Sequence, residues 1–169
     1  MHSDFSHGFA PVARADARIL VLGSLPSRRS LEAGEYYAHP RNAFWPIMAE
    51  LCGATGAYRE RCLRLMACGI AIWDVLAASE RPGSLDADIR QETAKANDFE
   101  GFFRGHPRIE RIGFNGKTAA RLYARFVAPG VGTAGPRVVQ LPSTSPANAR
   151  LRFPDKLEAW RRFLSDRQA

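Results

Sequence analysis

The amino-acid sequence predicts an α/β protein, a three-layer α/β/α sandwich with a central, mostly parallel four-stranded sheet. Short apolar runs alternate with helical patterns along the 169 residues, and neither an internal repeat nor a linker divides the chain. Strands that alternate with helices pair in parallel, and the helices then cover both faces of the sheet. This length suffices for one hydrophobic core. We therefore expect one domain over residues 1–169, with residues 1–14 as a loosely ordered N-terminal segment.

Four short apolar runs are the predicted strands, and each is typical of a strand buried on both faces. They are 17–22, 70–73, 109–114 and 137–141. Three of them lead into loops rich in small, polar or proline residues. These loops are 23–27, 113–117 and 141–148. Because ligands bind beyond the carboxyl ends of parallel strands, we expect the three loops to converge into one site.

Helical patterns fill most of the chain between the strands. The pattern over 44–51 has Pro46 in its first turn, where proline is best tolerated. The other predicted helices are 58–67, 94–103, 118–127 and 154–163. The polar, turn-rich segment 78–89 is predicted to be a long functional loop.

The composition is basic, with a net charge of +7 that comes mainly from arginine. Only three of the 24 basic residues are lysines. Arginine binds phosphate through a planar, bidentate guanidinium, which favours a nucleic-acid partner. A GC-rich genome would enrich arginine equally, so composition alone leaves both explanations open.

The cysteines and the N-terminus indicate neither a metal site nor export. Cys52, Cys62 and Cys68 have no common zinc spacing, and we expect free thiols, no metal and no cofactor. Residues 1–9 lack the apolar run of a signal peptide, and no stretch has the length of a membrane span. We therefore expect a cytoplasmic protein without membrane contact. The sequence says little about assembly, and a monomer is the default expectation.

One aromatic-rich string carries a family resemblance. EYYAHPRNAFWP at 35–46, with GSLPSRRSLEAG before it, resembles the uracil-DNA glycosylase superfamily and within it the hypoxanthine-DNA glycosylases, also called DNA-deoxyinosine glycosylases. The resemblance runs from Ile19 to about Phe163. It implies a monofunctional enzyme of base excision repair that binds DNA containing deaminated bases. Such an enzyme flips the base out and hydrolyses its N-glycosidic bond, leaving an abasic site. Hypoxanthine is the first expected base and uracil the second.

The resemblance assigns the catalytic role to Asn42. Most of the superfamily has an Asp or Asn in the loop after the first strand, where this chain has Leu25. In the hypoxanthine branch the catalytic Asn comes from the later motif, and Asn42 matches it. We expect its amide to position the hydrolytic water. Asn42 could instead simply cap the helix that follows. Asp74 is the alternative water-activating residue, although it could equally cap a helix or bind an arginine.

Four residues are expected to bind the base. Tyr37 matches the aromatic residue that stacks on the flipped base, with Tyr36 as the alternative. Asn115 matches a position that reads the base through an amide, although Asn before Gly is also a common turn pair. Gly23 and Ser24 bring backbone N–H groups close to the substrate.

Further residues are expected to contact DNA. Ser27 and Arg28 are candidate phosphate contacts, and Ser84 is expected near the mouth of the site. Ser27 could equally cap a helix. The loop LPSTSPANA resembles the family's second signature loop, which presses on the minor groove. Its candidate contacts are Ser143, Thr144, Ser145 and Pro146.

Two other functions remain open at this point. Leu25, in place of a polar residue, favours a damaged-DNA-binding module without catalysis. A hydrolase of free nucleosides would use the same bond chemistry without DNA.

Overall fold

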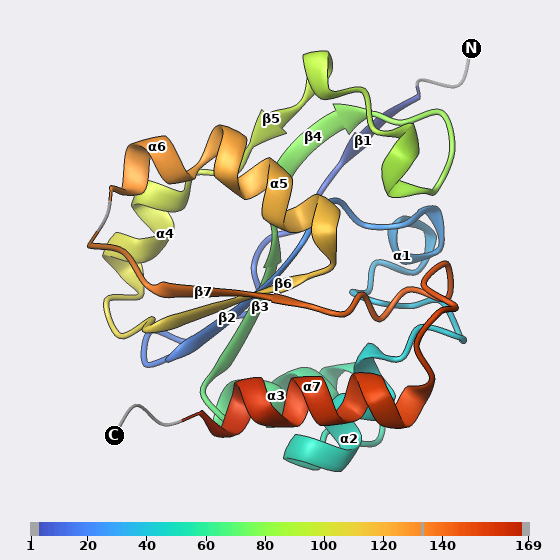
Figure 1. Cartoon of the computed structure of the whole chain (residues 1–169), viewed down its shortest axis with the longest axis vertical. Helices are drawn as coiled ribbons and strands as arrows, with labels where there is room; N and C mark the ends of the chain where they lie inside the picture. The colour runs from blue at the N-terminus through green and yellow to red at the C-terminus, as the bar shows by residue number, and fades with distance from the viewer. Residues whose placement is uncertain (1–3, 133, 167–169) are drawn as a thin grey trace.

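The computed structural model describes residues 4–132 and 134–166 and has a four-stranded parallel sheet at its centre (Figure 1). The strand order is β3-β2-β6-β7. The strands are β2 (Ile19–Gly23), β3 (Ile70–Asp74), β6 (Arg111–Asn115) and β7 (Arg137–Leu141). The predicted α/β fold and all four strands are confirmed, and each observed strand begins and ends within two residues of its predicted limits.

Helices cover both faces of this sheet (Figure 1). One face carries α2 (Phe44–Cys52), α3 (Tyr58–Ala67) and α7 (Phe153–Ser165); the other carries α4 (Phe99–Gly105), α5 (Lys117–Phe126) and α6 (Ala128–Val131). The central strand β2 serves both layers because successive side chains point to opposite faces. Leu20 and Leu22 join the core under α4 and α5, whereas Val21 joins the core under α2 and α7. In the described residues no helix is both long and apolar enough to cross a membrane.

A second sheet was not predicted from the sequence. It is antiparallel, with the order β1-β4-β5, and consists of β1 (Phe5–His7), β4 (Leu76–Glu80) and β5 (Lys95–Ala96). The prediction that residues 1–14 are loosely ordered is wrong for the described part of this segment. There β1 pairs with β4, and Val12 forms a bridge with Ile72. Residues 1–3 lie outside the described residues.

This sheet also corrects two predicted elements. The expected loop over 78–89 begins only after Glu80, because β4 pairs on both sides. The expected helix over 94–103 begins at Phe99, since Asp98 accepts a hydrogen bond from the backbone N–H of Gly101 at 2.9 Å and caps the helix there.

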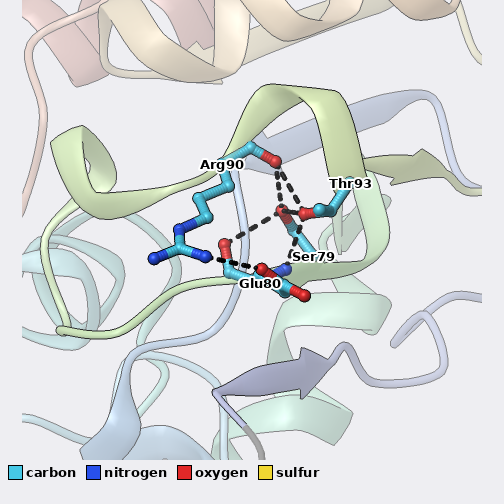
Figure 2. A network of polar contacts seen from close by, with 4 residues as sticks. All are labelled: Ser79, Glu80, Arg90 and Thr93. Carbon is cyan, nitrogen blue, oxygen red and sulfur yellow. Dashed lines mark hydrogen bonds and ion pairs between the residues drawn. The ribbon is translucent and has the colours of Figure 1, made fainter.

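Polar contacts fix the two ends of the remaining loop, 81–89, to each other (Figure 2). The Ser79 hydroxyl donates to the Arg90 carbonyl at 3.0 Å, and Thr93 Oγ1 accepts from the Glu80 backbone N–H at 2.9 Å. Arg90 and Glu80 also form an ion pair at 2.9 Å. The loop contains a short 3₁₀ turn, η1 (Asp86–Asp88), and η2 (Gln91–Thr93) follows it. These contacts therefore hold the two ends of the loop together.

Candidate active site

The loops after β2, β6 and β7 converge with the segment that precedes α2, as the sequence predicted. Ala43 donates its backbone N–H to the Thr144 carbonyl at 2.9 Å, and Asn115 bonds the same Thr144. Gly116 donates its backbone N–H to the Leu141 carbonyl at 3.2 Å. These contacts join segments that are far apart in the sequence, and in Figure 1 the segments lie to the right of the sheet.

Asn42 caps α2, as one of the two sequence interpretations expected. Its Oδ1 accepts the backbone N–H of Phe44 at 2.9 Å, and the side chain is half-buried. The helix begins at Phe44, as the sequence predicted. An amide oxygen has two lone pairs, so Oδ1 retains one acceptor position, and Nδ2 is not needed for the cap. Capping and water positioning are therefore compatible.

Asn115 uses both ends of its amide to hold Thr144. Its Nδ2 donates to Thr144 Oγ1 at 2.9 Å, and its Oδ1 accepts the Thr144 backbone N–H at 2.9 Å. Both residues are buried, with Thr144 only 1% exposed. Thr144 therefore supports the loop from within rather than presenting a surface to DNA. We call Asn42, Asn115 and Thr144 the amide cluster; its members are tied together through Ala43.

Tyr37 has the one positive φ, 55°, among the described non-glycine residues. Such strain persists where the surroundings impose it, and it is frequent at functional sites. The Tyr37 ring stacks on Phe44, with centroids 4.1 Å apart and planes at 28°. A base that stacks on Tyr37 must therefore use the opposite face of the ring. Tyr36, the alternative, is only 3% exposed, and its hydroxyl donates to the Ala10 carbonyl at 2.9 Å. It belongs to the core.

Asp74, at the end of β3, is 4% exposed. Its Oδ2 has no hydrogen-bond partner among the described residues, and the same is true of the Tyr37 hydroxyl. A Cβ on Gly23 would lie 2.5 Å from Asp74 Oδ1 and 3.4 Å from the Tyr37 hydroxyl. Glycine is thus required for the carboxyl group to occupy this place. We call Gly23, Tyr37 and Asp74 the Asp74 cluster.

Burial controls the protonation of this cluster. Burial, followed by the charge of Asp86, raises the pKa of Asp74 to about 7, against a smaller opposing effect of Arg81. Burial and the nearby Asp74 raise the pKa of the Tyr37 hydroxyl, while the amide of Asn115 lowers it to a lesser extent. Tyr37 therefore stays neutral, and Asp74 changes charge near neutral pH.

Loop 81–89 contributes two residues whose roles the sequence did not reveal. The Ser24 hydroxyl donates to the carboxylate of Asp86, so this expected base-binding residue holds the loop. The Arg81 guanidinium is buried and donates to the carbonyls of Leu25 and Pro26. Burial lowers the pKa of Arg81. The sequence did not indicate that Arg81 is buried, because an arginine in a turn-rich segment is expected at the surface.

The expected DNA contacts near α1 (Arg28–Ala33) have local roles as well. Ser27 caps this helix by accepting the Ser30 backbone N–H at 3.2 Å, which confirms the capping interpretation. The guanidinium of Arg28 donates to the Pro82 carbonyl at 3.1 Å and remains exposed, as does Ser84. Arg28 and Ser84 are therefore accessible to a partner.

The loop after β7 is shaped by its own hydroxyls. Ser143 Oγ accepts the Ser145 backbone N–H at 3.2 Å, and Ser145 Oγ accepts the Ala147 backbone N–H at 3.2 Å. Both serines and Pro146 are half-buried. Each hydroxyl acts here as an acceptor, so its proton remains available to a phosphate oxygen.

The fold and the site define a class: a parallel α/β domain whose functional loops meet at the carboxyl edge of the sheet. The model of the Uracil DNA glycosylase superfamily matches residues 10–164, and the chain belongs to this superfamily. The resemblance inferred from the sequence is thereby confirmed.

Three proteins of known sequence or structure are similar to the chain over most of its length. It is 36% identical over 146 residues to a hypoxanthine DNA glycosylase of Methanosarcina acetivorans, covering 85% of this chain and 88% of the relative. It is 35% identical over 113 residues to a hypoxanthine DNA glycosylase of Methanosarcina barkeri, covering 65% and 70%. A solution NMR structure of a candidate uracil DNA glycosylase from Methanosarcina acetivorans has a TM-score of 0.77 and 34% identity, covering 95% of this chain and 98% of that one.

Proposed function

We propose that this chain is a monofunctional DNA glycosylase that hydrolyses the N-glycosidic bond of hypoxanthine in deoxyinosine-containing DNA, with uracil as a second substrate. Two relatives that are 35–36% identical to it are named for hypoxanthine. The products are a free base and an abasic site. The monomeric chain would act on DNA in the cytoplasm, without a cofactor.

The position of Asn42 carries the proposal. Its Oδ1 is held by the Phe44 N–H, and the next residue, Ala43, is bonded to Thr144. The amide is therefore held by its own segment, and the backbone next to it is held by the loop after β7. A fixed amide oxygen can accept a hydrogen bond from a water molecule and orient it toward the anomeric carbon. An amide is a poor base, so it acts by positioning.

Catalysis also requires stabilisation of the sugar cation as the base leaves. DNA phosphates and the departing base supply the negative charge that stabilises this cation. The protein's part is to hold the bent backbone around the flipped nucleotide. Arg28, Ser27, Ser84, Ser143 and Ser145 are the proposed backbone contacts, and Pro146 stiffens the loop that presses on the minor groove.

The test is base release from duplexes that contain inosine, uracil, xanthine or a G·T mismatch, with free inosine as a further substrate. We expect release from the inosine duplex first and none from free inosine. The abasic product should remain unbroken, and borohydride should trap no covalent complex. Release from free inosine alone would indicate a nucleoside hydrolase. Damage-specific binding without any release would indicate a binding module.

A further inference from the structure

Leu85 is the most exposed large apolar side chain among the described residues, with 56% of its surface accessible. It lies in loop 81–89, directly before the turn η1. A single exposed leucine is ordinary on a protein surface and by itself indicates no partner. Leu63 on α3, which is 55% exposed, is a residue of this kind. Leu85 differs from it because its loop is rigidly held and is bonded to the candidate site.

The backbone of Leu85 is fixed on both sides. Its N–H donates to the Asp88 carboxylate at 3.2 Å, and its carbonyl accepts the Asp88 backbone N–H at 3.0 Å. A Cβ on Gly83 would collide with Asp88 Oδ2, so glycine is required there for the carboxylate to take this position. The turn therefore presents the Leu85 side chain in a defined direction, and its backbone has little freedom left to lose when a partner binds.

The same loop is bonded to the residues that follow β2. Asp86, the residue after Leu85, accepts the hydroxyl of Ser24. The buried guanidinium of Arg81 donates to the carbonyls of the two residues after Ser24. At the other end of the loop, Ile89 is packed in the core under α4 and α5. Leu85 is thus one residue away from a direct bond to the site.

The charges around Leu85 are compatible with DNA. Both carboxylates of the turn, Asp86 and Asp88, are already hydrogen-bonded within the protein. The exposed guanidinium of Arg28 donates one hydrogen bond to the Pro82 carbonyl at 3.1 Å, and its other N–H groups remain for a phosphate. An apolar side chain beside a cation is the combination with which proteins enter a base stack while they hold the DNA backbone.

Loop 81–89 also lies where DNA would reach it. Figure 1 shows this loop and the loop after β7 on opposite sides of α1, all to the right of the parallel sheet. DNA that contacts the loop after β7 and Arg28 on α1 therefore extends toward loop 81–89. Residues 143–149 of the loop after β7 include no large aliphatic or aromatic side chain. That loop consequently offers no bulky group to occupy a gap in the duplex.

We propose that Leu85 enters the base stack of the DNA beside the flipped nucleotide and keeps the duplex open there. The inference rests on the proposed function, because it names the residue that stabilises the opened duplex at that same site. A flipped base loses its stacking and pairing in the duplex. An apolar side chain inserted between base steps replaces part of the lost stacking and kinks the DNA. An inosine in single-stranded DNA has no pair to open, so its release does not need this side chain.

The first experiment compares single-turnover release of hypoxanthine from an inosine duplex and from the same strand without its complement. We expect Leu85→Ala to act about tenfold more slowly than the wild type on the duplex, and within about twofold of it on the single strand. Leu85→Met keeps a long apolar side chain and should restore the duplex rate. Leu63→Ala, the matched control on α3, should keep the wild-type rate on both substrates.

A second experiment detects the insertion without catalysis. The duplex contains an inosine nucleotide fluorinated on its sugar, whose glycosidic bond resists hydrolysis, next to a fluorescent adenine analogue that brightens when it unstacks. At saturating protein, the wild type and Leu63→Ala should brighten the analogue, and Leu85→Ala should do so much less. The salt dependence of binding should be unchanged in Leu85→Ala, because no phosphate contact is lost. In Arg28→Gln the slope of log Kd against log salt should fall by about one.

The outcomes are distinct. Equal duplex rates and equal brightening for the wild type and Leu85→Ala would overturn the inference, while the proposed function stands. A loss of equal size on the duplex and the single strand would also overturn it, because Leu85 would then support the site itself. If the single strand is a substrate for neither protein, the brightening decides. A wild type that releases no base from any duplex would overturn the proposed function, and the brightening would still show whether Leu85 enters the stack.

Discussion

The amide cluster and the Asp74 cluster lie at the same edge of the sheet but differ in how their polar groups are used. In the amide cluster, the Asn115 amide bonds Thr144 of another segment, and the Asn42 amide bonds the backbone of Phe44 two residues further on, all at 2.9 Å. In the Asp74 cluster, Oδ2 and the Tyr37 hydroxyl have no partner among the described residues. Amides that are fully bonded give a rigid frame, whereas buried polar atoms without partners can form hydrogen bonds to a ligand. We propose on this basis that the amide cluster positions the water and that the Asp74 cluster, which includes Tyr37, binds the base.

The largest effect should come from Asn42→Ala. Loss of the group that orients the water should lower the single-turnover rate by at least about a hundredfold. Binding to an abasic-site duplex should persist, because the proposed contacts to the DNA backbone do not include Asn42. Asn42→Ser is the matched control, since serine also caps helices and should restore stability without restoring the rate. A fast Asn42→Ala enzyme would remove the amide cluster from the chemistry.

Gly23→Ala should have the next largest effect, through the Asp74 cluster. The added Cβ would lie 2.5 Å from Asp74 Oδ1 and displace the carboxyl group. We expect kcat/KM for the inosine duplex to fall by about tenfold or more. Gly105→Ala is the control, because a Cβ there meets nothing within 4 Å. Equal activities of the two variants would show that the position of the Asp74 carboxyl group is unimportant.

Asn115→Ala should act on stability and binding more than on chemistry. The substitution breaks two buried hydrogen bonds to Thr144, and the free energy of unfolding should fall by about 2–3 kcal/mol. KM for DNA should rise as the loop after β7 loosens. Thr144→Ser, which keeps both bonds, should change neither quantity much. A drop in kcat alone, at unchanged stability, would instead indicate that Asn115 contacts the base.

The smallest effect is the pH dependence of stability. Burial raises the pKa of Asp74 from 3.8 to about 7, so folding favours its protonated form. That contribution is complete below about pH 4 and is lost as the pH rises through about 7. Relative to Asp74→Asn, the wild type should lose about 1 kcal/mol between pH 6 and pH 8. Urea unfolding of both proteins measures this difference, and parallel curves would mean that Asp74 is charged throughout.

The sequence predicted the parallel sheet well because its strands are continuous apolar runs with distinct loop signals. It failed for β4 and β5, since Ser79 and Glu80 make β4 look like a loop and β5 is only two residues long. The cap formed by Asn42 is local and could be foreseen. The surroundings of Asp74 could not, because they depend on residues from three separate segments: Gly23, Tyr37 and Arg81.

The most direct test of the account compares Asn42→Ala with Asp74→Asn in single-turnover release of hypoxanthine from an inosine duplex near pH 6.5. The division of roles between the clusters predicts a loss of at least about a hundredfold for Asn42→Ala, and a rate within about tenfold of the wild type for Asp74→Asn. An inactive Asp74→Asn enzyme beside an Asn42→Ala enzyme of nearly wild-type rate would contradict it and make Asp74 the residue that activates the water.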